Sequence, residues 1–243
     1  MGNMKVREII AKNIAPMLRD GELVNLGVGM PTMVGNYVDP SVHLMFHGEN
    51  GTIGASRQIP NDMCDSPEKF LAWEDAHSGY RSDYKTGHKD LVNAGSYFIT
   101  LDEGSCCFGL ATSFAIARGG HLDATVLGAL QVDQHADLAN WLIPGKRENG
   151  MGGAMDILSG AKRAIIAMEH QTRGGSPKLL SKCTLPLTAV HCVDTVVTEK
   201  CIVGFDDEGF VIKAMYPGVT REELLSTIEG HVSFAEDMKE MII

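Results

Sequence analysis

The sequence predicts an α/β fold in which a mainly parallel sheet is flanked by helices. Short apolar runs of strand length alternate with segments of helical periodicity for most of the 243 residues, a pattern typical of parallel sheets. The hydrophobic content of 44% is sufficient for a sizeable core. No repeat or linker divides the chain, so we expect a single domain over residues 1–243.

The N-terminal elements lead directly to a candidate site. An apolar stripe at near-helical spacing predicts a helix from Val6 to Leu18. Leu23 to Leu26 predicts a buried strand, and Thr32 to Tyr37 the helix that follows it. Val42 to Phe46 predicts a second strand, which ends just before Glu49. In α/β proteins, ligand chemistry gathers at such strand ends.

Residues 56–90 interrupt this alternation. They are rich in Asp, Ser, Lys and His, which predicts a long surface insert with a short helix at Pro67 to Trp73. Alternation then resumes with predicted strands and helices in turn. The strands are expected at Tyr97–Thr100, Ala124–Leu127 and Ala164–Met168, and the helices at Phe108–Arg118 and Asp156–Ala161.

The C-terminal quarter changes character. Thr195 to Val197, Cys201 to Phe205 and Phe210 to Met215 predict a meander, because Asp206 to Gly209 supplies turn residues between the last two strands. Thr220 stands three residues before Glu223, the spacing of a helix-capping box.

Composition argues against several classes of function. The net charge is -10 and no Lys/Arg-rich run occurs, so neither nucleic acid nor a membrane surface is expected as a partner. No apolar run reaches membrane-spanning length. The six cysteines contain no Cys-x-x-Cys pair, and no signal peptide is recognisable, so we expect free thiols in a cytoplasmic protein.

Metal and serine-hydrolase chemistry are not indicated. His43 and His47 share a face of the predicted strand but would lie about 13 Å apart. No Gly-x-Ser-x-Gly elbow occurs. The glycine-rich turn Gly27 to Thr32 has three interpretations. It fits a dinucleotide-binding turn poorly, and it fits either a tight strand-to-helix turn or a turn whose backbone N–H groups face an acyl or CoA group.

Glu49 lies between glycines in the segment His47-Gly48-Glu49-Asn50-Gly51-Thr52-Ile53-Gly54. This segment resembles the Glu-Asn-Gly signature of family I CoA-transferases, in the beta-type subunit, which carries the catalytic glutamate. Further segments resemble that family in the same order along the chain. They are Asn25-Leu26-Gly27-Val28-Gly29-Met30-Pro31, Asn93-Ala94-Gly95, Arg118-Gly119-Gly120-His121, Asp137-Leu138-Ala139-Asn140-Trp141, Pro144-Gly145-Lys146, Gly150-Met151-Gly152-Gly153-Ala154-Met155-Asp156, Met168-Glu169-His170 and Cys183-Thr184-Leu185-Pro186-Leu187-Thr188.

The resemblance implies a three-layer CoA-transferase-like domain and assigns roles to five residues. Glu49 would be the nucleophile and would form a glutamyl-CoA thioester. The N–H of Gly153 would bind the oxyanion, with a second donor from the partner subunit. Asn25, Gly29 and Asn50 would bind substrate. No metal or cofactor is implied, since coenzyme A is itself a substrate.

The implied reaction moves coenzyme A between an acyl-CoA and a short-chain carboxylic acid, such as the 3-oxo acid acetoacetate. The implied partner is a homologous alpha-type subunit, in a heterotetramer. The alternatives are an acyl-CoA hydrolase and a non-catalytic regulatory subunit. Three departures from the family pattern leave the substrate open: Gly48 in place of Ser or Thr, Ala55-Ser56-Arg57 in place of a Gly-Pro turn, and Ser96 in place of Lys.

Overall fold

The computed structural model describes residues 3–59, 68–69, 91–145 and 151–243. Most of its strands join one ten-stranded sheet. In sheet order these strands are β13 (Val232–Glu240), β12 (Phe210–Met215), β11 (Cys201–Phe205), β10 (Thr195–Val197), β8 (Ala164–Ala167), β5 (Ala124–Gly128), β1 (Leu23–Leu26), β2 (Met45–Gly48), β3 (Thr52–Ile59) and β4 (Phe98–Cys107).

The centre of the sheet is parallel and its flanks are mixed. The five adjacent strands β10, β8, β5, β1 and β2 pair in parallel, as the strand–helix alternation predicts. The pairs β2–β3, β3–β4, β10–β11 and β11–β12 are antiparallel, and β12 pairs with β13 in parallel. A separate three-stranded sheet contains β7 (Leu138–Ala139), β6 (Gln131–Asp133) and β9 (Leu179–Leu180).

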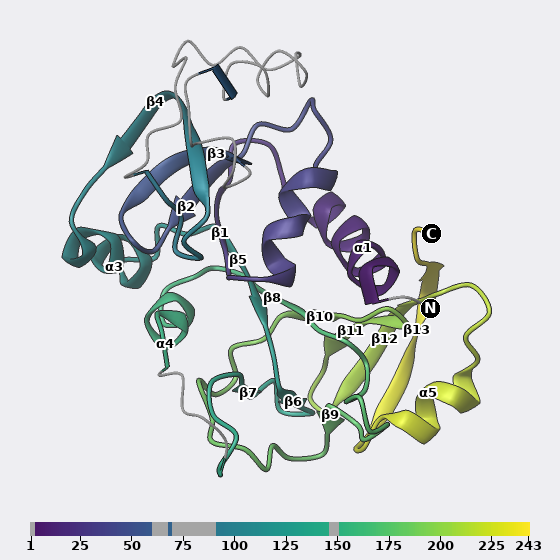
Figure 1. Cartoon of the computed structure of the whole chain (residues 1–243). Helices are drawn as coiled ribbons and strands as arrows, with labels where there is room; N and C mark the ends of the chain where they lie inside the picture. Colours follow the sequence, from purple (N-terminus) through teal and green to yellow (C-terminus); the bar gives the residue numbers. More distant parts are fainter. Residues whose placement is uncertain (1–2, 60–67, 70–90, 146–150) are drawn as a thin grey trace.

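Helices cover both faces of the large sheet, which gives the expected three layers. The helices are α1 (Asn3–Ile14), α3 (Leu110–Arg118), α4 (Ala154–Leu158) and α5 (Arg221–Thr227), with short 3₁₀ helices η1 (Ala15–Met17) and η2 (Met30–Tyr37). Figure 1 shows α1 and α4 on opposite sides of the central strands. Because neighbouring strand residues point to opposite faces, Ile165 packs with α1 whereas Ile166 packs in the cluster that contains Leu158 of α4.

Several sequence predictions are confirmed. The three strands of the C-terminal meander have the predicted bounds. The Thr220 hydroxyl accepts a hydrogen bond from the Glu223 N–H at 3.1 Å and so caps α5. The helix expected at residues 108–118 is present at Leu110–Arg118, whereas the helix expected at 156–161 begins and ends earlier, at Ala154–Leu158.

Other predictions need correction. The element expected at Thr32 to Tyr37 is a 3₁₀ helix that begins at Met30. The second strand begins at Met45 instead of Val42, because residues 39–42 form a turn closed by the Val42 N–H and the Asp39 carbonyl. Residues 56–59 belong to β3 and not to the insert, since pairing with β4 overrides their polar composition.

For two further strands, the sequence predicted too short a strand or none, because strand pairing again overrides polar composition. Strand β4 continues to Cys107, well past the predicted Thr100. Strand β13 was not expected, because its polar residues alternate weakly. Of the predicted helix at Pro67 to Trp73, Glu68 and Lys69 are helical, and the remaining positions lie outside the described residues. In the part of the chain that the structure describes, no helix is long and apolar enough to cross a membrane.

Candidate active site

Glu49 is the first residue of the tight connection between β2 and β3. The Gly51 N–H donates to the Gly48 carbonyl at 2.9 Å and closes the turn. Gly51 has a φ of 116°, and a Cβ at this position would collide with the carbonyl oxygen of Phe108. Only glycine satisfies both conditions. The turn is therefore fixed against the segment that leads into α3.

The carboxylate of Glu49 lies against Gly153, the residue immediately before α4. A Cβ built on Gly153 would be 2.5 Å from Oε2 and 3.0 Å from Cδ of Glu49, and 2.8 Å from the ring of Phe114 in α3. The two residues that the sequence singled out for catalysis are thus direct neighbours. Phe114 was not anticipated from sequence, because nothing in a helical apolar residue distinguishes a site wall from a core position.

Burial, and secondarily the negative charge of Asp156, raise the pKa of Glu49. Among the described residues, no hydrogen bond or ion pair holds the Glu49 carboxylate. Asp156 itself is paired, since Arg118 approaches it at 2.6 Å through Nη2 and at 2.8 Å through Nε. The site therefore contains a partly desolvated carboxylate that no cation among the described residues neutralises.

The three residues expected to bind substrate are placed differently from one another. Asn25 is buried, and its side-chain amide contacts His47 and Thr125. Asn50 is exposed and donates from Nδ2 to the Val92 carbonyl at 2.7 Å. Gly29 is exposed at the start of η2 with a φ of 91°. The amides of Asn25 and Asn50 hold protein groups here, so their contact with substrate stays a prediction.

The structure gives a local reason for one departure from the family pattern, Gly48, and places a second, Ser96, near the Glu49 loop. A Cβ at Gly48 would lie 2.5 Å from Oγ1 of Thr52 and 2.9 Å from Oδ1 of Asn50, so a larger residue requires both side chains to move. Ser96 has a φ of 63°, in the left-handed region, and its N–H donates to the Asn93 carbonyl at 2.9 Å. Asn50 is tied to Val92, so the turn that contains Ser96 adjoins the Glu49 loop.

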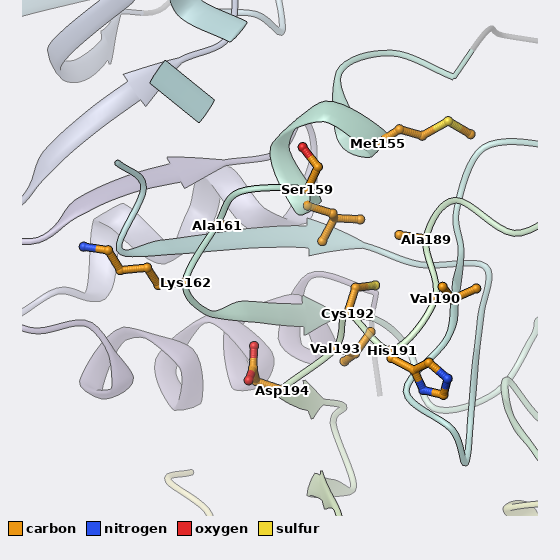
Figure 2. Close-up of a pocket in the computed structure, with 11 residues that line it drawn as sticks. Met155, Ser159, Ala161, Lys162, Ala189, Val190, His191, Cys192, Val193 and Asp194 are labelled. Carbon is orange, nitrogen blue, oxygen red and sulfur yellow. The ribbon is translucent and has the colours of Figure 1, made fainter. Parts of the chain in front are cut away.

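A hollow of about 500 Å³ opens on another part of the surface. Figure 2 shows α4 and the loop after it on one side of this hollow, including Met155 and Lys162, and the segment from Ala189 to Asp194 on the other. Glu49 does not line it. Within the described residues, no cluster of three or more His, Cys, Asp or Glu side chains is arranged to hold a metal ion.

His47 was not expected from the sequence to support this site. The sequence suggested it only as a candidate metal ligand, whereas in the structure it is buried beneath the Glu49 loop and hydrogen-bonded to Asn25 and Ser113. The available signal was its position two residues before Glu49 on a buried strand.

Comparison with known proteins is consistent with this arrangement. Residues 85–226 match the Coenzyme A transferase family. The beta chain of the acetate CoA-transferase of Haemophilus influenzae is 44% identical over 240 residues, which cover 99% of this chain and 97% of that protein. The mitochondrial succinyl-CoA:3-ketoacid coenzyme A transferase 2B of Mus musculus is 36% identical over 97% of this chain, which spans only 41% of the mouse protein.

Among solved structures, the acyl-CoA transferase YdiF of Escherichia coli O157:H7 has a similar fold. Its TM-score is 0.70 at 17% sequence identity, and the match covers 100% of this chain and 44% of that one. The sequence identity to the Haemophilus protein extends over nearly the full length of both chains. On that basis, this chain belongs to the coenzyme A transferase family.

Proposed function

We propose that this chain is the beta-type subunit of a CoA-transferase that moves coenzyme A between an acyl-CoA and a short-chain carboxylic acid. The observation that carries the proposal is the contact between the Glu49 carboxylate and Gly153. A nucleophile must lie beside the hydrogen-bond donors that stabilise the negative charge of the transition state. A glycine at the start of a helix presents backbone N–H groups with no side chain to obstruct them. The relatives' names supply the acyl-CoA substrate class.

The proposed route is ping-pong. A Glu49 oxygen attacks the thioester carbonyl and the C–S bond breaks. Coenzyme A leaves as a thiolate, and a mixed anhydride of Glu49 and the first acid remains. The thiolate then attacks the glutamyl carbonyl, which forms a glutamyl-CoA thioester and releases the first acid as a carboxylate. The carboxylate of the second acid then attacks the glutamyl-CoA thioester, and the same two steps run in reverse. The second acid leaves as its acyl-CoA and Glu49 is regenerated. Each step is an ordinary acyl transfer, which is the advantage of covalent catalysis.

This chemistry makes specific demands on the protein. One thioester replaces another, so the route itself requires neither a redox cofactor nor a metal. Glu49 needs no general base, because an attacking carboxylate carries no proton to remove. The oxyanion needs donors, and we assign one to the Gly153 N–H, a group worth about 3–4 kcal/mol in comparable sites. Partial burial of Glu49 also limits hydrolysis of the anhydride by water.

A homologous alpha-type subunit is proposed as partner, in a heterotetramer. The chain aligns along its whole length with a relative named as the beta chain of its enzyme. It aligns with only 41% of a mitochondrial enzyme, as one half of a two-part enzyme would. The second oxyanion donor is assigned to that partner. Gly48 and Ser96 border the Glu49 loop, so we assign the choice of acid to this region.

The test is covalent trapping. The protein, in complex with its partner subunit, is incubated with acetyl-CoA or acetoacetyl-CoA, reduced with borohydride and mapped by mass spectrometry. Conversion of Glu49 to the alcohol supports the proposal, because borohydride reduces a thioester but not a carboxylate. Absence of the alcohol with several acyl-CoAs contradicts it. Release of free coenzyme A without an acceptor acid indicates a hydrolase, and inertness toward every acyl-CoA indicates a regulatory subunit.

A further inference from the structure

Four buried polar side chains form a continuous row beneath the Glu49 loop. Thr125 on β5, Asn25 on β1 and His47 on β2 are direct cross-strand neighbours in three adjacent parallel strands. Ser113 of α3 packs over His47. All four are 0–3% exposed. We call these four residues the polar row.

Hydrogen bonding runs in one direction through the polar row. Thr125 Oγ1 donates to Asn25 Oδ1 at 3.1 Å, which leaves the Asn25 Nδ2 group as the donor toward the next strand. That group lies 3.2 Å from the His47 carbonyl oxygen and 3.3 Å from His47 Nδ1. An amide NH₂ only donates, so a hydrogen bond between this group and His47 Nδ1 requires Nδ1 to be the acceptor.

With Nδ1 as the acceptor, a neutral His47 ring carries its proton on Nε2. This nitrogen lies 2.9 Å from Ser113 Oγ, which accepts from it and turns its own hydrogen to the Gly48 carbonyl at 3.4 Å. Protonation of Nδ1 would set two donors against each other at Asn25. Burial lowers the pKa of His47, which agrees with a neutral ring.

Two members of the polar row, Asn25 and Ser113, bind the backbone just before Glu49. Asn25 binds the carbonyl of His47, and Ser113 binds the carbonyl of Gly48. These are the two peptide groups that precede the Glu49 Cα. Glycine at 48 has no side chain of its own to fix the local backbone, so the polar row supplies restraint from one side of the loop.

We infer that His47 is a positioning residue which, through Asn25 and Ser113, holds the Glu49 carboxylate at the attack position beside Gly153. The inference rests on the proposed function. Its chemical basis is the steep dependence of acyl transfer on geometry, in which a displacement of about 1 Å costs about 100-fold in rate. His47 does not touch substrate in this role, so it affects the rate of attack and leaves acyl-CoA binding intact.

The test compares four variants in the complex with the partner subunit. His47→Leu removes both ring nitrogens, and Ser113→Ala removes the link to the Gly48 carbonyl. His47→Gln keeps an amide N–H that reaches the place of Nε2. His170→Leu is the matched control, because His170 is equally buried and bonded to two hydroxyls, Thr198 and Thr227, but shares no partner with the Glu49 loop among the described residues.

Steady-state kinetics and hydrogen exchange are measured together. We expect kcat to fall about tenfold or more in His47→Leu and Ser113→Ala, with KM for acyl-CoA within about threefold of the wild type. His47→Gln should recover most of the loss. Amide exchange of the peptide spanning residues 45–54 should accelerate in His47→Leu and remain unchanged in His170→Leu.

The outcomes separate the two hypotheses. A wild-type complex that forms no Glu49 adduct contradicts the proposed function, and the exchange measurement then still decides whether His47 holds the loop. If the wild type forms the adduct and His47→Leu matches its kcat, the positioning role alone is refuted. Equal losses of kcat per folded protein in His47→Leu and His170→Leu also refute it, because they would reflect general destabilisation.

Discussion

Gly153→Ala is the sharpest test of the geometry around Glu49. The added methyl group would be 2.5 Å from Oε2 and 3.0 Å from Cδ of Glu49. The Glu49 carboxylate is the end of a flexible side chain, whereas the ring of Phe114, 2.8 Å away, is held in a helix. The carboxylate must therefore move by about 1 Å to reach ordinary contact distance. The Gly153 backbone, with a φ of -87°, accommodates alanine without strain.

A displacement of this size predicts a loss in kcat/KM of about 100-fold, or about 2.7 kcal/mol of transition-state stabilisation. Alanine retains the backbone N–H at position 153, so the loss isolates crowding of the nucleophile from loss of an oxyanion donor. The Phe114 ring must shift as well, but it and Glu49 are both only partly buried, so thermal unfolding should change little. The assay is transfer of coenzyme A between labelled acids, with borohydride trapping at Glu49.

Gly174→Ala is the matched control. A Cβ there has its nearest neighbour 3.9 Å away, and Gly174 is exposed, so activity should stay at the wild-type level. If Gly153→Ala is folded and its kcat/KM stays within about threefold of the wild type, the contact between Glu49 and Gly153 does not determine the position of the nucleophile, and the reasoning fails.

Three further predictions concern stability. Burial raises the pKa of Glu49 above its ordinary value of 4.5, so the folded protein loses stability as the pH rises and Glu49 ionises. Glu49→Gln should therefore have a higher melting temperature than the wild type at pH 7. Equal melting temperatures at pH 7 would contradict the raised pKa. Arg163→Ala leaves the partly buried Glu22 without its ion pair and should lower the free energy of unfolding by about 2 kcal/mol. Lys162→Ala breaks a more exposed ion pair with Asp123 and should lower it by under about 1 kcal/mol. Urea titrations measure both, and equal losses would refute the distinction between the two pairs. Thr220→Ala removes the cap of α5 and should lower the free energy of unfolding by about 1 kcal/mol. Thr220→Ser keeps a capping hydroxyl and should retain the wild-type stability. A serine variant as unstable as the alanine variant would contradict the capping role.

Local patterns were sufficient for much of the fold. The meander strands, the α5 cap and the buried central strands follow from side-chain periodicity and turn residues, which act over a few positions. The strands that were missed or shortened, β3, β4 and β13, have polar or irregular sequences. Their extended conformation comes from pairing with neighbouring strands, an interaction between distant segments that no local window records.

The candidate site likewise has features that follow from local sequence and features that depend on the tertiary structure. The sequence by itself determined that Glu49 directly follows a strand and lies between glycines, and the ordered motifs around it indicated the family. Tertiary structure decided that Gly153 touches the Glu49 carboxylate, that the Asn25 amide holds His47, and that Ser113 reaches the carbonyl before Glu49. These contacts join strands and helices from separate parts of the chain. Their distances are set by sheet register and helix packing, which are properties of the assembled fold.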